Sequence, residues 1–215
     1  MQQEVLYLPA SWKAHMNVVQ YTGDWNVLSL RSPGGITDNI VPEILDTETI
    51  TFKDTPLMEQ CPAIQKLVAS LNCEVYAVRL MNLKKGATIK PHRDKELCFE
   101  NGEARLHIPI FTNDQVAFYS QDNLIPMREG ECWYINANIT HSVQNNGTSD
   151  RIHLVIDCAV NDAIEALFEQ ADKTEKAEEL DVNQTLEVIK ALRQMNTATS
   201  LDLAASLETR LQIEA

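Results

Sequence analysis

Two side chains that can bind a metal ion stand two residues apart in the stretch Ile89-Lys90-Pro91-His92-Arg93-Asp94. A strand directs residues i and i+2 to the same face, so His92 and Asp94 can reach one ion together. A further histidine, His141, ends a second strand-like run. Two histidines and one carboxylate form the facial triad of non-haem Fe(II) oxygenases, which leaves positions open for a bidentate cosubstrate and O2. We therefore predict that His92, Asp94 and His141 are metal ligands at a catalytic site.

Basic residues that follow this motif strengthen the prediction. Arg151 begins the strand after His141, where a buried cation could hold the distal carboxylate of a dicarboxylate cosubstrate through a charge-assisted fork. An ordinary strand-edge arginine paired with an acid is the alternative. Arg105 and His107 share a strand face and add hydrogen-bond donors, although His107 could also be a core histidine bonded to backbone. His153 either lines the site or packs within the sheet.

Short strand-like runs, separated by turn signals, hold these residues between about positions 74 and 158. About seven runs at close intervals predict a mainly β fold with helices, a double-stranded jelly roll or cupin-like barrel. We expect Val116–Ser120 to pair with Arg105–Phe111 across the turn between them. Residues 95–103 follow the first two candidate ligands and form either a lid or a simple exposed loop. The runs are 74–80, 88–91, 105–111, 116–120, 131–135, 139–143 and 151–157.

The flanking segments are less regular. Glu4–Leu8 alternates weakly as a strand does, Ser11–Gln20 resembles a short helix, and Asn26–Arg31 reads as a strand that ends at Ser32-Pro33-Gly34-Gly35. In most of Pro56–Leu71 the apolar residues recur at helical spacing, which predicts a helix. We expect Trp133 and Tyr134 to lie in the core and Arg31 in solvent.

After Val160 the apolar residues again recur at helical spacing, which predicts helices. One helix is capped by Asn161-Asp162, a second runs from about Leu186 to Met195, and a third is capped by Ser200. The segment 161–215 holds 12 acidic and 5 basic residues, with a charged stretch at 172–181. We predict a jelly-roll domain over 1–160 and a small acidic helical appendage over 161–215, which docks on the sheets or pairs two subunits as a homodimer.

Composition excludes several classes of partner. With 18 basic and 31 acidic residues the formal net charge is −13, which argues against nucleic acid and anionic membranes. The five cysteines form no C-x-x-C pair and lie mostly in apolar runs, as expected of reduced thiols. The chain begins without a signal-peptide pattern, and no apolar run approaches the ~18 residues of a membrane span. We predict a cytoplasmic protein.

From Val78 to Asp157 the chain resembles the aspartyl/asparaginyl β-hydroxylase family of Fe(II)- and 2-oxoglutarate-dependent dioxygenases. The shared features keep the family's order and spacing, and the set is more specific than any one piece. They are Gly86 before Pro91-His92, Arg105-Leu106-His107, Gly130 with Trp133, and His141 before Arg151.

The resemblance implies a role for each matching residue. His92 and His141 would bind iron, Arg151 would bind a carboxylate of 2-oxoglutarate, and Arg105 and His107 would lie on the cosubstrate or substrate side of the pocket. The large animal members of the family have a glycine two residues after the first histidine. Asp94 occupies that position here, as a carboxylate does in bacterial small-molecule members such as the cis-proline hydroxylases.

One position departs from the family pattern. A serine that helps to hold 2-oxoglutarate in the animal enzymes falls near Met81, whose side chain cannot take that role. Asn82 and Tyr76 are the substitutes that we consider.

The family's activity implies that Fe(II), 2-oxoglutarate and O2 are used to hydroxylate an unactivated C–H bond. A free amino acid such as proline, or an Asp- or Asn-type residue in a peptide, would be the substrate. Two other hypotheses stay open. The chain could be a non-catalytic cupin-like module that binds a metal or ligand, or an interaction protein whose functional part is the acidic appendage.

Overall fold

The computed structural model describes residues 1–8, 11–41, 51–94, 97–172 and 182–213. The chain forms two compact units, Met1–Gln170 and Ala171–Ala215. The predicted division at residue 160 differs from this boundary by one helix, α3 (Asp162–Glu169), which belongs to the first unit. Ile164 and Phe168 of α3 pack into the hydrophobic core of that unit. Nearly all of the charged stretch at 172–181 lies outside the described residues.

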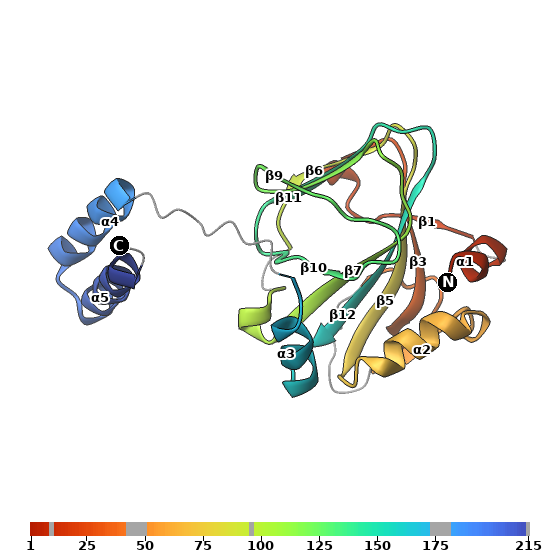
Figure 1. Ribbon diagram of the computed structural model, residues 1–215, viewed down its shortest axis with the longest axis horizontal. Helices are drawn as coiled ribbons and strands as arrows, with labels where there is room; N and C mark the ends of the chain where they lie inside the picture. The colour runs from red at the N-terminus through yellow and green to blue at the C-terminus, as the bar shows by residue number, and fades with distance from the viewer. Residues whose placement is uncertain (9–10, 42–50, 95–96, 173–181, 214–215) are drawn as a thin grey trace. The chain divides into compact units, whose positions relative to one another are not determined.

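The first unit consists of two β-sheets with short helices around them (Figure 1). Its helices are α1 (Gln2–Tyr7), α2 (Pro62–Ser70) and α3, with 3-10 turns η1 (Val18–Gln20), η2 (Met58–Gln60) and η3 (Phe99–Asn101). Its strands are β1 (Lys13–Ala14), β2 (Tyr21–Thr22), β3 (Trp25–Pro33), β4 (Phe52–Asp54), β5 (Val75–Leu83), β6 (Thr88–His92), β7 (Glu103–Phe111), β8 (Val116–Ser120), β9 (Asn123–Ile125), β10 (Trp133–Tyr134), β11 (His141–Asn145) and β12 (Arg151–Ala159).

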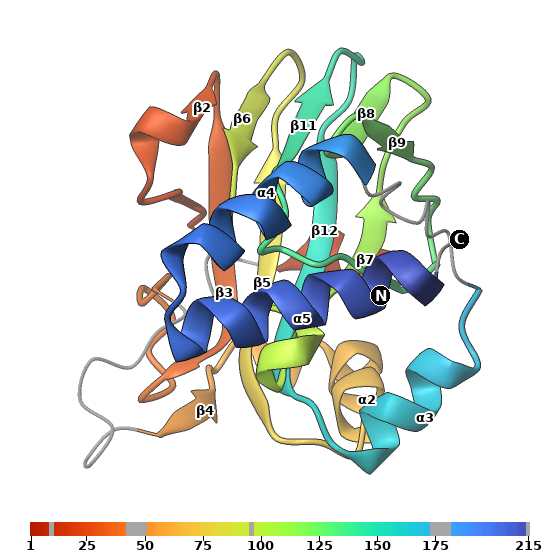
Figure 2. The same ribbon diagram turned by 90° about the vertical axis from the view of Figure 1, so that its left-hand side faces the viewer.

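Both sheets are antiparallel. The larger has the strand order β1-β3-β5-β12-β7-β10, with β4 beside β3, and the smaller has the order β2-β6-β11-β8-β9. Figure 2 shows β6, β11 and β8 of the smaller sheet side by side. This arrangement confirms the predicted double-sheet β fold.

Alternation along the long strands of the larger sheet creates two separate cores. Residues of one face, such as Leu28, Leu80 and Leu154, pack in one cluster with Ile64 of α2. Residues of the opposite face meet the inner face of the smaller sheet. That second core contains Trp25, Val27, Met81, Leu83, Ile89, Phe118, Val143 and Val155. The space between the two sheets is therefore where inward-facing polar residues would gather.

Several local predictions are wrong. Residues 4–8, predicted as a strand, lie largely in helix α1, whose only buried residue is Val5. Residues 11–20, predicted as a helix, contain strand β1 and turn η1, because β1 pairs with β3. The expected pairing of 116–120 with 105–111 is absent, since β8 joins β11 and β9 in the smaller sheet while β7 lies in the larger.

The second unit contains the helices α4 (Val182–Met195) and α5 (Ala198–Ile213). A two-pronged ion pair joins them, with the Arg193 guanidinium 2.8 and 2.9 Å from the carboxylate of Glu208. Ser200 does not begin α5 as predicted. The Thr197 hydroxyl accepts from the Ser200 N–H, and the Ser200 hydroxyl accepts from the Thr197 N–H, so the two residues cap the helix reciprocally.

Within the described part of the chain, none of the helices combines the length and the apolar character that crossing a membrane requires.

Candidate metal and cosubstrate site

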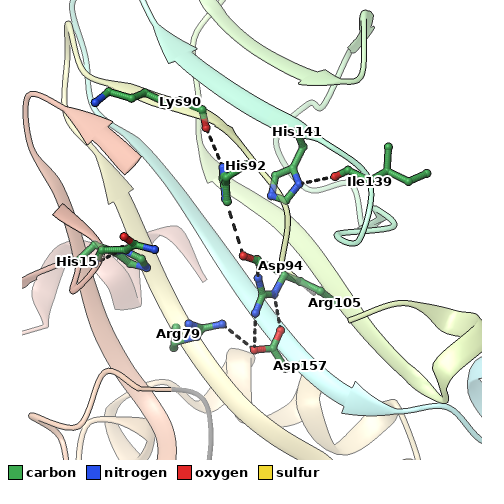
Figure 3. A network of polar contacts seen from close by, with 10 residues as sticks. His15, Arg79, Lys90, His92, Asp94, Arg105, Ile139, His141 and Asp157 are labelled. Atoms are coloured by element: carbon green, nitrogen blue, oxygen red, sulfur yellow. Dashed lines mark hydrogen bonds and ion pairs between the residues drawn. The ribbon is translucent and has the colours of Figure 1, made fainter. Parts of the chain in front are cut away.

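His92 and His141 face each other from neighbouring strands of the smaller sheet. β6 ends at His92, β11 begins at His141, and the two residues are register partners with ring centroids 4.2 Å apart. His92 Nδ1 lies 2.8 Å from the Lys90 carbonyl oxygen, and His141 Nδ1 lies 3.0 Å from that of Ile139 (Figure 3). When each Nδ1–H donates to its carbonyl, the Nε2 lone pair stays free, which is the form that binds a metal.

Asp94 completes a group of three ligands. One ligand atom each from His92, Asp94 and His141 lie within 4.8 Å of one another. One carboxylate oxygen of Asp94 is 3.9 Å from Nε2 of His92, while the other accepts a hydrogen bond from Arg105. The Asp94 N–H also donates to the Ala137 carbonyl at 2.9 Å, which holds the chain after β6 against the loop before β11. Two imidazoles and one carboxylate suit a divalent first-row metal such as Fe(II).

Arg105 connects Asp94 to a buried ion-pair cluster on the larger sheet (Figure 3). Its Nε lies 2.6 Å from Asp157, its register partner on β12, and Arg79 of β5 lies 2.6 Å from the same carboxylate. Burial alone would raise the pKa of Asp157, but the Arg105 and Arg79 guanidiniums hold it below its ordinary value. The predicted contact of Arg105 with a cosubstrate stays a prediction, and these ion pairs favour another role, the orientation of Asp94.

Arg151 is a buried cation without an anionic partner among the described residues. Its side chain, on β12, is 3% exposed. One guanidinium nitrogen donates to Nδ1 of His153 at 2.8 Å, and Nε has no hydrogen-bond partner in the described part of the chain. Burial lowers the pKa of Arg151 to about 9, so it remains mostly charged at pH 7. A buried positive charge in this environment is suited to binding an anionic ligand from solution.

The two remaining inward-facing histidines differ in what they contact. His153 accepts from Arg151 and is 1% exposed, in agreement with packing inside the sheet. Among the described residues His107 Nδ1 has no hydrogen-bond partner, and no backbone hydrogen bond to this ring is found there, in contrast to the backbone-bonded core histidine that we considered as an alternative. Burial and then the charge of Arg151 lower the pKa of both rings well below the ordinary value, which keeps both neutral.

A pocket of about 860 Å³ contains these groups together. The candidate ligands His92, Asp94 and His141 line it with the predicted cosubstrate residues Arg151, Arg105 and His107. The structure thus brings together all six residues that the sequence singled out. Their chemical roles remain proposals.

Other residues that the sequence analysis considered are now placed. Met81 and Tyr76 line the pocket, whereas Asn82 points elsewhere and lies 3.5 Å from Asp150. Trp133 and Tyr134 do not line it. Tyr134 packs against Phe168 of α3 with the ring centroids 4.8 Å apart and the rings inclined by 42°, and the Trp133 indole donates to Glu131. Arg31 lines the pocket, is half-buried and forms an ion pair with Asp54 at 2.8 Å, so the expectation that it lies in solvent is wrong. Residues 95 and 96 of the predicted lid lie outside the described residues.

The pocket residues that were not predicted include Asp157, Arg79 and His15. Asp157 continues the i+2 series of Arg151 and His153 on one strand face, so alternation offered a signal for it. Arg79 likewise lies two residues before Met81 on β5, so the two share a strand face. His15 belongs to the segment that was predicted as a helix, and nothing in its local pattern directs it to the pocket.

Two antiparallel sheets enclose two histidines, a carboxylate and a buried arginine that has no anionic partner among the described residues. In this double-sheet fold the two histidines and the carboxylate are the set of side chains that a facial-triad metal site requires. The chain belongs to the Aspartyl/Asparaginyl beta-hydroxylase family, whose family model matches residues 2–160. The resemblance noted from the sequence is thereby confirmed.

Individual relatives are more distant. The chain is 29% identical over 137 residues to the L-proline cis-4-hydroxylase of Rhizobium meliloti (strain 1021), covering 63% of this chain and 48% of that protein. It is 32% identical over 158 residues to L-proline cis-3-hydroxylase 1 of Streptomyces sp, covering 71% and 53%. The chain therefore spans about half the length of these curated relatives. A 2OG-Fe(II) oxygenase family oxidoreductase from Burkholderia pseudomallei aligns with a TM-score of 0.48 and 13% identity, covering 73% of this chain and 76% of that one.

Proposed function

We propose that this chain is an Fe(II)- and 2-oxoglutarate-dependent hydroxylase of a free amino acid. The observation that carries the proposal is the presence, in one pocket, of a three-ligand group and a buried guanidinium without a counter-ion among the described residues. A cosubstrate that chelates a metal with one end and carries a carboxylate at the other would satisfy both features. 2-Oxoglutarate has this chemistry.

Each residue has a distinct task in this proposal. His92, Asp94 and His141 would hold Fe(II), which together with 2-oxoglutarate supplies the oxidation of a C–H bond by O2. Arg151 would take the distal carboxylate through a charge-assisted fork. These contacts fix where the cosubstrate lies, and the buried sheet faces around them limit the access of water.

The amino-acid substrate is supported by the family and by the two similar proteins that are named for L-proline. We therefore take L-proline as the first compound to test. Asp- and Asn-type residues in peptides are the other substrates that the sequence suggested. A cytoplasmic location and a homodimer formed through the second unit stay predictions.

The test is product formation across a panel of free amino acids and short Asp- or Asn-containing peptides. We expect one free amino acid to gain a single oxygen atom by mass spectrometry, with an equal amount of succinate formed from 2-oxoglutarate. The Asp94→Ala variant should form neither product. Asp38→Ala removes a carboxylate that is 70% exposed and outside the pocket, so it should retain the activity. Absence of both products with the wild-type protein across the panel would contradict the proposal.

A further inference from the structure

One wall of the pocket carries two hydrogen-bond donors that the proposed iron and cosubstrate contacts do not use. Trp25, at the start of β3, is 6% exposed and lines the pocket. Its indole N–H is buried and has no acceptor among the described residues. An unpaired buried donor destabilises the protein, so a molecule that accepts a hydrogen bond from it is bound more tightly.

The second donor is His15, which lies flat against Trp25. The two rings are 3.6 Å apart between centroids and inclined by 14°. Burial, and then the charge of Arg79, lower the pKa of His15 to about 4, so the ring is neutral at pH 7. The Asn17 N–H donates to Nδ1 at 3.3 Å, and the single ring proton therefore belongs on Nε2. No acceptor for Nε2–H is found among the described residues.

Both rings are held in place before any ligand binds. The His15 N–H donates to the Trp25 carbonyl at 2.8 Å, next to the β1–β3 pairing. Tyr21 packs edge-on against both rings, at 6.4 and 5.7 Å, and its hydroxyl lies 3.3 Å from the His15 carbonyl. Little conformational freedom remains to be lost when an acceptor binds.

The position of His15 relative to the metal ligands suits a substrate. In Figure 3 His15 lies on the other side of His92 and Asp94 from His141. His15, Trp25 and the candidate ligands all line the same pocket. A small molecule bound against the two rings would therefore lie beside the metal site.

The charge of the pocket indicates what that molecule is. The arginines that line it are Arg31, Arg79, Arg93, Arg105 and Arg151, and the carboxylates are Glu74, Asp94, Glu103 and Asp157. Five cations against four anions leave one positive charge, and a divalent ion together with a dianionic cosubstrate leaves that balance unchanged. A monoanionic group is thus favoured in the remaining space.

We propose that the indole N–H of Trp25 and the Nε2–H of His15 bind the carboxylate of a free amino-acid substrate. The inference rests on the proposed function and names the contact that selects a free amino acid. A peptide or amide presents a neutral carbonyl instead of a carboxylate at this point, and it would bind more weakly.

The indole signals of protein labelled with [15N]tryptophan test the contact directly. The titration uses L-proline, added to protein saturated with Zn(II), a diamagnetic substitute, and 2-oxoglutarate. The Trp25 signal, assigned through Trp25→Phe, should move downfield and saturate. Trp133, whose indole already donates to Glu131 at 2.8 Å, should not move. L-Prolinamide should shift Trp25 less and bind at least tenfold more weakly.

Variants separate the donor from the ring stack. His15→Phe keeps an aromatic ring on Trp25 but removes the Nε2–H, and it should weaken L-proline binding by about 10-fold or more, as expected for a hydrogen bond to a charged group. Asp38→Ala keeps both donors and changes no residue that lines the pocket, so it should bind L-proline as the wild type does. Neither variant should change the affinity for 2-oxoglutarate.

Specific results would overturn the subsite. It is wrong if 2-oxoglutarate alone moves the Trp25 signal, because the donors then serve the cosubstrate. It is also wrong if L-proline is hydroxylated with the same KM by His15→Phe, or if no free amino acid moves the Trp25 signal. In the last case, the visible metal-to-ligand charge-transfer band of the anaerobic Fe(II)–2-oxoglutarate complex shows whether the subsite alone is wrong or the proposed function as well. If this band is present, only the subsite is wrong. If it is absent, the proposed function is wrong too.

Discussion

Replacing Arg151 by methionine tests whether this arginine is kept for binding or for folding. Methionine has a similar length and apolar stem but no charge. Arg151 is 3% exposed, its only hydrogen-bond partner among the described residues is His153, and no carboxylate there forms an ion pair with it. A charged group in such a position opposes folding.

The size of the effect follows from this environment. An uncompensated buried charge costs about 3–5 kcal/mol, and water in the adjoining pocket reduces that cost. We therefore expect Arg151→Met to raise the free energy of unfolding by about 1–3 kcal/mol, after the loss of the hydrogen bond to His153. The same variant should lose about 100-fold or more in affinity for 2-oxoglutarate, since two charge-assisted hydrogen bonds are removed.

Urea unfolding with and without 2-oxoglutarate measures both effects. The cosubstrate should stabilise the wild-type protein by mass action and leave Arg151→Met unchanged. Arg31→Met is the control, because Arg31 is 26% exposed and paired with Asp54, and it should change the stability by at most about 1 kcal/mol. The reasoning fails if Arg151→Met is less stable than the wild type by more than about 1 kcal/mol, or if 2-oxoglutarate still stabilises it.

Three further predictions concern the fold around the site. Asp157→Asn removes the carboxylate that Arg79 and Arg105 share, and urea unfolding should show a free energy of unfolding lower by about 3–5 kcal/mol. A decrease below about 1 kcal/mol would contradict a stabilising role of these ion pairs. Because the pKa of Asp157 is depressed in the folded protein, its contribution to stability is complete above the unfolded pKa, near 4, and is lost as pH falls through the folded pKa. The difference in the free energy of unfolding between the wild type and Asp157→Asn should therefore narrow below about pH 4. A difference that stays constant with pH would refute this. Gly23 and Gly86 both have φ of +75°, but a Cβ at Gly23 would meet Ala87 Cβ at 2.9 Å and one at Gly86 meets nothing within 4 Å. Gly23→Ala should thus lower the melting temperature more than Gly86→Ala, by the equivalent of about 1–3 kcal/mol, and equal losses would contradict the packing argument.

The sequence predicts the strands of the larger sheet well because each alternates between two buried faces. The Arg151–Asp157 run, for example, supplies Leu154 to one core and Val155 to the other. The i, i+2 spacing of His92 and Asp94 pointed to the candidate ligands, but strand alternation is not what brings them together. β6 ends at His92, and Asp94 reaches the site from the segment after the strand, where its N–H donates to the Ala137 carbonyl.

What the sequence could not predict depends on pairing between distant strands. Adjacency along the chain suggested that residues 105–111 and 116–120 form a hairpin, but the chain crosses to the other sheet between them. The ion pairs of Arg105 depend on the β7–β12 register, which places Asp157 opposite it. The position of His15 depends on the pairing of a two-residue strand, β1, which local propensity cannot reveal.

The central claim is that His92, Asp94 and His141 hold an iron ion that 2-oxoglutarate chelates. Anaerobic addition of Fe(II) and 2-oxoglutarate tests it most directly, through the weak visible metal-to-ligand charge-transfer band. We predict the band in the wild-type protein and in Asp38→Ala, and its loss in Asp94→Ala and His141→Ala. A folded wild-type protein that gives no band, or a band that persists in His141→Ala, would contradict the claim.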